Sequence, residues 1–431
     1  MTFKTIEHKN LDEKLLYAKH SSGLDVYVLP KQGFSKYYAV YAAKYGSIDN
    51  CFKAVGDNEA TTVPDGIAHF LEHKLFEQKD GTNAFDQFSL TGANANAFTS
   101  FDVTAYLFSC TDNFYVNLEL LLDFVGEPYF TDENVSKEQG IIGQEIQMYD
   151  DDPNWRVYFN LLRGLYQKFP VKYDITGTVE SISQITPEIL NKCYDVFYTP
   201  ENMLLFLVGD IDETEAAKLV DKHVRARGVE IERIYPDEPA EIVGDMTQKL
   251  AVSIPMFYLG FKDTDISYSA GEPSGGERLL KRKLIAKIAL EALCGKSSEL
   301  YTKLYEQGLI DDSFGHEVNF EKHYGFTALG GESRNPQAVR AEITTYISEI
   351  KQNGFNATDI ARVKKMFKGG FLRRFNSIEG IGNNFMRSIF DDIDVFSTLD
   401  VYDKITDEEV NKFFAEHFDA KNMVMSVIEP L

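Results

Sequence analysis

The chain has 431 residues, a length that corresponds to about two or three domains. Hydrophobic residues make up 44% of the chain and charged residues 26%, which is the balance of a globular protein and argues against disorder. The net charge of −23 would repel nucleic acid and anionic membrane surfaces, so neither class of partner is expected.

The N-terminal segment and the cysteines indicate a cytoplasmic protein. The first 16 residues, MTFKTIEHKNLDEKLL, lack the apolar core and the small-residue cleavage site of a secretory signal. No stretch of the sequence approaches the roughly 20 apolar residues of a membrane span. The four cysteines lie far apart and form no C-x-x-C pair, which favours reduced thiols over a disulfide framework or a cysteine-rich metal site.

Strand-like runs open the first half of the chain, with VYVLP from Val26 and YYAVYAAKYGS from Tyr37. Long helical segments and a hairpin-like region follow them. Consecutive strands without a regular β-α-β alternation predict an α+β fold, in which a mainly antiparallel sheet carries helices packed on one face.

The segment PDGIAHFLEHKLFEQ, which begins at Pro64, contains an H-x-x-E-H motif formed by His69, Glu72 and His73. Its pattern predicts a helix over residues 67–78, with the Pro-Asp pair at its start. About 0.02 motifs of the form H-x-x-[DE]-H are expected by chance in a chain of this composition. A single histidine on a helix is usually an ordinary surface or core residue, but packing alone explains a pair with a glutamate between them poorly.

The spacing of the motif suits a metal ion with a base beside it. On a helix, His69 and His73 lie one turn apart, so their rings converge on one point outside the same face. Two imidazoles in that position suit Zn²⁺, which takes nitrogen ligands at about 2.0–2.1 Å. Glu72 borders this face and can reach a water beside the metal without binding the metal itself, as a general base does.

A catalytic zinc needs a third protein ligand, and SKEQGIIGQEIQMY offers two carboxylates. Glu138 and Glu145 are seven residues apart, so both project from one face of a helix. One of them can bind the metal, while the other accepts a hydrogen bond from a ligand histidine. The alternative is that both acids belong to a solvent-exposed helix face.

A repeated segment indicates a duplication. ITPEILNKCYDVFYTPENM begins at Ile185 and ITDEEVNKFFAEHFDAKNM begins at Ile405, and seven of the 19 aligned positions are identical. Each copy predicts a helix capped by Thr186 or Thr406, followed by a short turn and a strand. The offset of 220 residues is too long for a solenoid and fits two copies of one domain.

The boundary between the copies is predicted where helical periodicity is lost. Residues 228–247 contain two prolines, two glycines and many acids, which is typical of a linker. A first domain is therefore predicted over residues 1–227 and a second over residues 248–431, with KLAVSIPMFYLGF as its first strand-like run.

The motifs resemble those of the inverted-motif zinc peptidases of the pitrilysin and mitochondrial-processing-peptidase family, in which H-x-x-E-H is followed by E-x-x-x-x-x-x-E. The resemblance implies that His69, His73 and Glu145 hold one Zn²⁺ per chain. It also implies that Glu72 acts as the base and that Glu138 orients the site.

Further segments extend the resemblance along nearly the whole chain. GANANAFTSFDVTAY is similar to the family's edge strand, which pairs with the peptide substrate, so Asn96, Ala97 and Thr99 are implied substrate contacts. The alternative is an ordinary edge strand. The implied architecture is two α+β domains of about 200 residues each that form half of a clamshell chamber, as in short bacterial members that work as dimers.

The second half departs from the family pattern at LYEQGLIDDSFG. Where many members have an Arg and then a Tyr that hold the substrate carbonyl, this chain has Tyr305 and, further on, Asp311 and Asp312. A carboxylate cannot stabilise an oxyanion. The departure therefore favours a heterodimer with a homologous sister chain that lacks the zinc motif but keeps the Arg/Tyr pair; a homodimer is the alternative.

These observations predict a cytoplasmic zinc endopeptidase that cleaves unfolded peptides or a precursor peptide inside a chamber formed by two chains. Glu72 is expected to take a proton from the attacking water and to pass it to the leaving amine. Two other functions stay open: a non-catalytic structural subunit of a processing complex, and a module that binds a peptide or carries a metal without cleavage.

Overall fold

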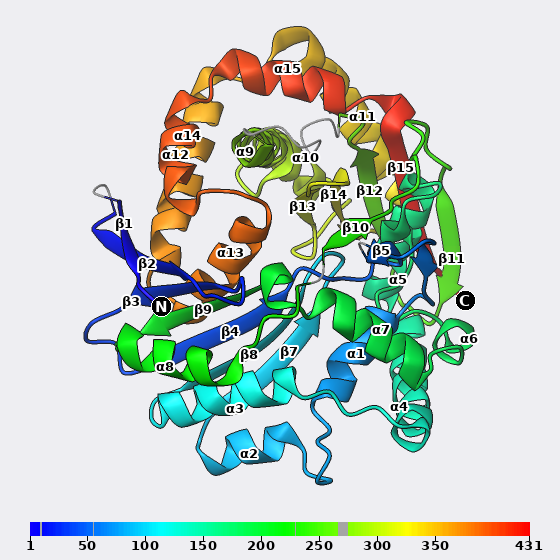
Figure 1. Ribbon diagram of the computed structural model, residues 1–431. Helices are drawn as coiled ribbons and strands as arrows, with labels where there is room; N and C mark the ends of the chain where they lie inside the picture. The colour runs from blue at the N-terminus through cyan, green and yellow to red at the C-terminus, as the bar shows by residue number, and fades with distance from the viewer. Residues whose placement is uncertain (9–10, 55, 229, 266–274) are drawn as a thin grey trace. The chain divides into compact units, whose positions relative to one another are not determined.

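The computed structural model describes residues 1–8, 11–54, 56–228, 230–265 and 275–431 (Figure 1). Contacts within the chain form two compact units, each discontinuous in sequence. The first comprises residues 1–146, 174–235 and 374–390, and the second comprises residues 147–173, 236–373 and 391–431. The chain leaves the first unit for the second after Tyr235, which lies inside the predicted linker of residues 228–247. The predicted limits of the two repeats, 1–227 and 248–431, stay a prediction.

A mixed sheet forms the centre of the first unit. Its strands have the order β1-β2-β3-β9-β4-β8-β7, and all neighbours are antiparallel except β3 and β9. The strands are β1 (Lys4–His8), β2 (Glu13–Lys19), β3 (Asp25–Pro30), β4 (Tyr37–Ala43), β7 (Asn94–Thr99), β8 (Thr104–Cys110) and β9 (Met203–Gly209). A smaller sheet pairs β5 (Cys51–Ala54) with β6 (Thr61–Thr62) and β10 (Ile231–Arg233).

Helices cover both faces of this sheet rather than the one face that was predicted, and the central strand β4 contacts them on both sides because its successive residues point in opposite directions. In β4, Ala39 and Tyr41 join the apolar core formed with α1, α3 and α7, whereas the Tyr38 hydroxyl donates to Asn383 of α13 at 2.9 Å. The helices of the unit are α1 (Ile67–Leu75), α2 (Ala84–Leu90), α3 (Phe114–Gly126), α4 (Asp132–Asp150) as far as Ile146, α6 (Val179–Ile182), α7 (Pro187–Phe197), α8 (Glu213–His223) and α13 (Ile378–Phe390).

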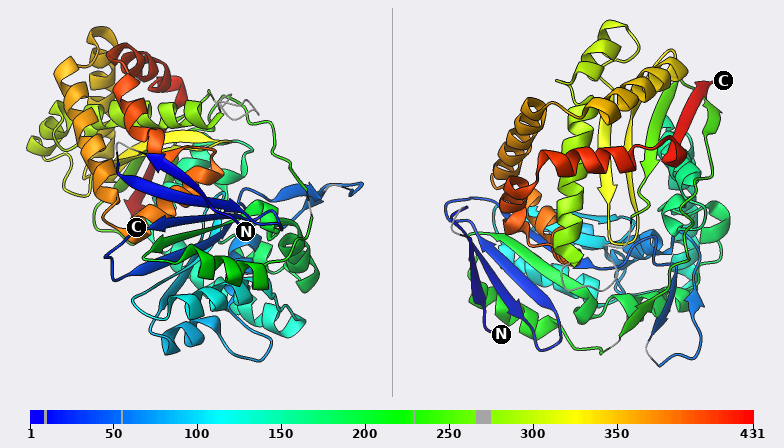
Figure 2. Two further views of the ribbon diagram at one scale, coloured as in Figure 1. Left: turned by 60° about the vertical axis from the view of Figure 1, so that its left-hand side comes forward. Right: turned by 90° about the horizontal axis from the view of Figure 1, so that it is seen from above.

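The sheet of the second unit repeats the topology of the first. Its order β11-β15-β12-β14-β13 matches β3-β9-β4-β8-β7, and its one parallel pair, β11 with β15, matches β3 with β9. The strands are β11 (Met246–Leu250), β12 (Met256–Lys262), β13 (Gly315–Phe320), β14 (Gly325–Glu332) and β15 (Met423–Pro430), seen side by side in Figure 1 and on the right of Figure 2. The shared order confirms the predicted α+β class and the two homologous domains.

The predicted helix caps are present in both repeats. Oγ1 of Thr186 accepts from the Ile189 amide, and Oγ1 of Thr406 accepts from the Glu409 amide. The helices of the second unit are α5 (Pro153–Leu165), α9 (Gly275–Cys294), α10 (Glu299–Glu306), α11 (Pro336–Asn353), α12 (Ala357–Arg374), α14 (Thr398–Lys404) and α15 (Asp407–His417). Among the described residues, none of the helices combines the length and the hydrophobicity needed to cross a membrane.

The large sheet of each unit is covered on one face by a helix from the other half of the sequence. α13 packs on β4 and β9 of the first unit, where Figure 1 shows it in orange beside these strands. α5 packs in the same way on β12 and β15 of the second unit. The sequence analysis did not predict this exchange.

Both exchanged helices carry a glycine where they meet the sheet. A Cβ on Gly382 of α13 would lie 2.5 Å from Cε1 of Tyr38. A Cβ on Gly164 of α5 would lie 2.5 Å from Cγ1 of Val424 in β15. Both distances are far below van der Waals contact, so the absence of a side chain at these positions permits the close approach of helix and sheet.

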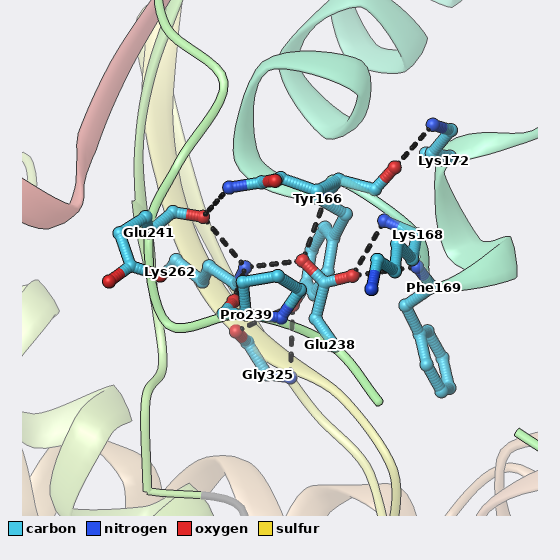
Figure 3. A network of polar contacts seen from close by, with 10 residues as sticks. Tyr166, Lys168, Phe169, Lys172, Glu238, Pro239, Glu241, Lys262 and Gly325 are labelled. Carbon is cyan, nitrogen blue, oxygen red and sulfur yellow. Dashed lines mark hydrogen bonds and ion pairs between the residues drawn. The ribbon is translucent and has the colours of Figure 1, made fainter. Parts of the chain in front are cut away.

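The chain that follows Tyr235 is fastened to the second unit by a buried ion pair (Figure 3). The Glu238 carboxylate accepts hydrogen bonds from the backbone amides of Gln167, Lys168 and Phe169 at 2.7–2.8 Å. The same carboxylate pairs with the Lys262 ammonium at 2.5 Å, and the Lys262 side chain is only 3% exposed. Burial works to raise the pKa of Glu238, but these bonds outweigh it and hold that pKa below its usual value.

Candidate metal centre and active site

Helix α1 places the H-x-x-E-H residues, and it is shorter than the sequence predicts. The helix runs from Ile67 to Leu75 rather than to residue 78, and its N-cap is Gly66, whose φ of 91° is unfavourable for other residues. A Cβ on Gly66 would lie 2.4 Å from the Thr176 carbonyl oxygen. The close approach of the 176–177 backbone therefore selects glycine as the residue before the helix.

The side chains of His69, His73 and Glu145 converge on one point. Nε2 of His69 lies 3.7 Å from Oε1 of Glu145, and Nε2 of His73 lies 3.6 Å from Oε2 of the same carboxylate. One ligand atom from each of the three residues lies within 4.8 Å of the other two. A tetrahedral ion with bonds of about 2.0–2.1 Å would hold its ligand atoms about 3.4 Å apart, close to the distances observed here.

The chemistry of these donors fits zinc. Two imidazole nitrogens and one carboxylate leave a fourth tetrahedral position open, as in catalytic zinc sites. Burial, helped by the nearby His73, lowers the pKa of His69 to about 3, so its ring stays neutral and able to bind a metal. Burial also works to lower the pKa of His73, but its hydrogen bond with Glu138 and the nearby carboxylates raise it overall. Glu72 and Glu138 add negative charge around the donors, and this charge favours a cation.

Glu138 contacts the second nitrogen of His73. Its Oε1 lies 3.1 Å from Nδ1 of His73, which leaves Nε2 of that ring facing Glu145. Within the described residues, Nδ1 of His69 is buried and has no such partner. Burial works to raise the pKa of Glu138, but the hydrogen bond from His73 and the charge of Lys74 lower it overall.

Thr99 holds the Glu72 carboxylate by a hydrogen bond that the sequence did not predict. Oγ1 of Thr99, at the end of β7, donates to Oε2 of Glu72 at 2.6 Å. Burial raises the pKa of Glu72, although the Thr99 bond and the charge of His73 partly oppose that effect. The family resemblance implied only a substrate contact for Thr99, because the partner of a hydroxyl is set by tertiary packing.

The predicted substrate strand lies at an end of the sheet in the described part of the chain. Asn96 of β7 is exposed and Ala97 is half-buried, and Oδ1 of Asn96 accepts from the Ala97 amide at 2.9 Å. An end strand has backbone groups free to pair with a further strand. Contact between these residues and a substrate stays a prediction.

The three residues at the departure from the family pattern are all solvent-accessible. Tyr305 is half-exposed on α10, with its ring stacked on Tyr301 at 6.0 Å. Asp311 and Asp312 are exposed in the following turn, where Oδ1 of Asp311 accepts from the Ser313 amide at 2.9 Å. No cationic side chain occupies these three sequence positions.

A second cluster of possible metal ligands already contains its own cation. His223 of α8 contacts Glu119 of α3 at 3.1 Å through Nε2 and contacts Asp123 through Nδ1. The Lys222 ammonium also pairs with Glu119 at 2.5 Å. Because both ring nitrogens and one carboxylate are engaged, this group is an ion-pair network between two helices.

Two family models match the chain. The model described as "Insulinase (Peptidase family M16)" matches residues 54–179, and the one described as "Peptidase M16 inactive domain" matches residues 184–367. The first match contains the three converging side chains.

Similar proteins span the whole chain. The uncharacterized zinc protease YmfH of Bacillus subtilis is 45% identical over 433 residues, which cover 99% of each chain. The crystal structure of an M16-like peptidase from Alicyclobacillus acidocaldarius is 33% identical with a TM-score of 0.91, covering 100% of this chain and 99% of that one. Pitrilysin, at 16% identity and a TM-score of 0.74, shares the fold over 99% of this chain and 46% of its own.

Proposed function

The chain belongs to the M16 family of zinc peptidases, and we propose on that premise that it is an endopeptidase whose own His69, His73 and Glu145 hold one zinc ion. The observation that carries the proposal is the position of Glu145, whose two carboxylate oxygens face the Nε2 atoms of both histidines at 3.6 and 3.7 Å. The neutral state of His69 supports it, because metal binding requires an unprotonated ring nitrogen.

Glu72 is the general base of this proposal. When bound, zinc supplies a Lewis acid that polarises the peptide carbonyl and lowers the pKa of a water. Glu72 takes a proton from the attacking water and returns it to the leaving amine. Its burial supports this role, because burial raises the pKa of Glu72 and a carboxylate of higher pKa is a stronger proton acceptor. Thr99 fixes the carboxylate through the bond to Oε2.

The substrate of the proposal is an unfolded peptide bound in extended form. β7 lies at an end of its sheet in the described residues, so an extended segment can add to it as a further strand. Asn96 and Ala97 then offer the contacts, while the Thr99 hydroxyl is already engaged by Glu72. A folded protein cannot add in this way because its backbone groups are already paired.

The partner in the proposal is a homologous sister chain. Stabilising the oxyanion calls for hydrogen-bond donors or cations. The positions where many members carry them hold Tyr305, Asp311 and Asp312 here. A sister chain with an Arg and a Tyr at these positions supplies what this chain lacks, and a homodimer is the alternative. The cytoplasmic location stays part of the proposal.

The test is cleavage of a mixed pool of unstructured peptides by the purified zinc-loaded chain, followed by mass spectrometry beside Glu72→Gln. We expect Glu72→Gln to bind zinc as the parent does but to cleave at least about 100-fold more slowly. The exposed Glu349→Gln serves as the matched control with parental cleavage. Equal cleavage by Glu72→Gln would refute the general-base assignment.

The behaviour of the parent chain alone separates the remaining possibilities. Cleavage without a partner makes the chain self-sufficient and rejects the sister chain. Zinc binding without cleavage directs the search to a sister protein that restores it. Stoichiometric zinc without cleavage in any assembly favours a structural subunit, and tight peptide capture without cleavage favours a binding module.

A further inference from the structure

Lys74 is fully buried directly after a proposed zinc ligand. Its side chain is 0% exposed, although lysine is almost never fully buried unless its charge is paired. It lies on α1, the helix that carries the H-x-x-E-H motif, yet neither zinc binding nor general-base catalysis as proposed above uses it. A buried cation beside a cation-binding centre needs a specific reason, because like charges repel.

The partners of Lys74 supply that reason. Its Nζ lies 3.5 Å from Oε2 of Glu138 and 2.5 Å from Oε2 of Glu77. Oε1 of the same Glu138 carboxylate contacts Nδ1 of His73 at 3.1 Å. Successive helical residues point about 100° apart, so Glu138 bridges two diverging side chains with one oxygen on each.

This bridge fixes the direction of the His73 ring. A carboxylate held on only one side can rotate about its terminal bonds, whereas Glu138 is held on both sides. With Oε2 on Lys74 and Oε1 on Nδ1 of His73, the opposite nitrogen, Nε2, faces Glu145 at 3.6 Å. Glu138 is itself buried, so removal of the lysine would leave its Oε2 in the interior without the ammonium that now holds it.

We propose that Lys74 is a positioning residue of the zinc centre, whose buried ammonium holds Glu138 so that His73 presents Nε2 toward His69 and Glu145. The inference rests on the proposed zinc-binding function. It assigns Lys74 no contact with the substrate or the metal, and its effect passes through Glu138.

The experiment measures the zinc affinity of the full chain by competition with a chelator, and the Co²⁺ absorption spectrum as a report on coordination geometry. We expect Lys74→Met to weaken zinc binding by about 10- to 100-fold, which is the usual effect of losing an outer partner of a metal ligand. Lys74→Arg keeps the charge and should restore affinity to within a few-fold of the parent. Lys262→Met removes a buried, ion-paired lysine of the second unit and is the matched control with parental zinc affinity.

A double-mutant comparison tests the route through Glu138. If Lys74 acts through that carboxylate, Lys74→Met combined with Glu138→Gln should bind zinc little worse than Glu138→Gln alone. If the two losses multiply, Lys74 acts independently of Glu138 and the inference is overturned. Parental zinc affinity in a folded Lys74→Met chain overturns it as well.

The remaining outcomes are also decisive. Lys74→Gln replaces Lys74→Met if the latter does not fold, and failure of both neutral variants to fold assigns Lys74 a structural role and overturns the inference. A parent chain that binds no zinc contradicts the proposed function itself. That result is distinguishable, because it appears before any variant is compared.

Discussion

Oγ1 of Thr99 donates a hydrogen bond to Oε2 of Glu72 at 2.6 Å, and this contact joins the end of β7 to α1. The strand proposed to receive the substrate is therefore connected directly to the proposed general base. The connection gives the pKa of Glu72 two opposing influences, since burial raises it and the Thr99 hydroxyl lowers it.

Thr99→Val should shift the pH dependence of cleavage. The substitution removes the hydroxyl that stabilises the ionised carboxylate, so the pKa of Glu72 should rise further. The base acts in its deprotonated form, and the acidic limb of kcat/KM should therefore move to higher pH. Thr99→Ser keeps the hydroxyl and should retain the parental profile; an unchanged limb in Thr99→Val would show that another group controls it.

Zinc removal should abolish cleavage and lower stability. A ligand that binds only the folded state stabilises it by about 2.7 kcal/mol when its concentration is 100 times Kd. We expect a chelator to lower the urea midpoint of the parent and added Zn²⁺ to restore it. Glu145→Gln lacks the negative charge of the third proposed ligand, so its urea midpoint should respond much less to the chelator or to added Zn²⁺. An equal response from this variant would exclude Glu145 as a ligand.

Gly382→Ala should destabilise the first unit. The added Cβ would lie 2.5 Å from the Tyr38 ring, and overpacking of a well-filled core costs about 1–3 kcal/mol. Gly369→Ala on α12 is the control, because a Cβ there meets no atom within 4 Å and alanine favours a helix. Urea unfolding measures both variants. Equal stability of Gly382→Ala and the parent would show that α13 can shift away from the sheet.

His417 should make the chain less stable in acid. Burial, aided by the charge of Arg282, lowers the pKa of this histidine from 6.5 to about 3. Between these pH values the unfolded chain takes up a proton that the folded chain does not, so stability falls as pH falls, by up to about 1.4 kcal/mol per pH unit.

The variant His417→Phe isolates this contribution. Phenylalanine has a similar shape and cannot be protonated. The free energy of unfolding of the variant should therefore depend less on pH between 5 and 6 than that of the parent. Loss of the bond between His417 and Thr327 lowers stability at all pH values, and the slope is therefore the quantity to compare. Parallel slopes for parent and variant would contradict a neutral His417 in the folded state.

The sequence predicted those parts of the molecule that local spacing determines. The caps at Thr186 and Thr406 depend on residues three positions away, and the common face of Glu138 and Glu145 depends on helical period alone. The repeat predicted the two similar domains, which the matching strand orders confirm.

Features set by contacts between distant segments were not predictable. The start of α1 after Gly66 depends on the backbone at residue 176, and the burial of Lys74 depends on α4. α5 and α13 have unremarkable amphipathic patterns, and a pattern shows that a helix has an apolar face without showing which sheet covers that face.

The exchange of α5 and α13 has a consequence for synthesis on the ribosome. One face of the first sheet is covered by α13, so a nascent chain must include residue 390 before that face is complete. Until then the apolar residues that later meet α13, such as Phe206, remain open to water or to chaperones. Release of a fragment that ends at residue 227 should therefore yield an aggregating product, and folding of the first unit should wait until most of the protein has been made.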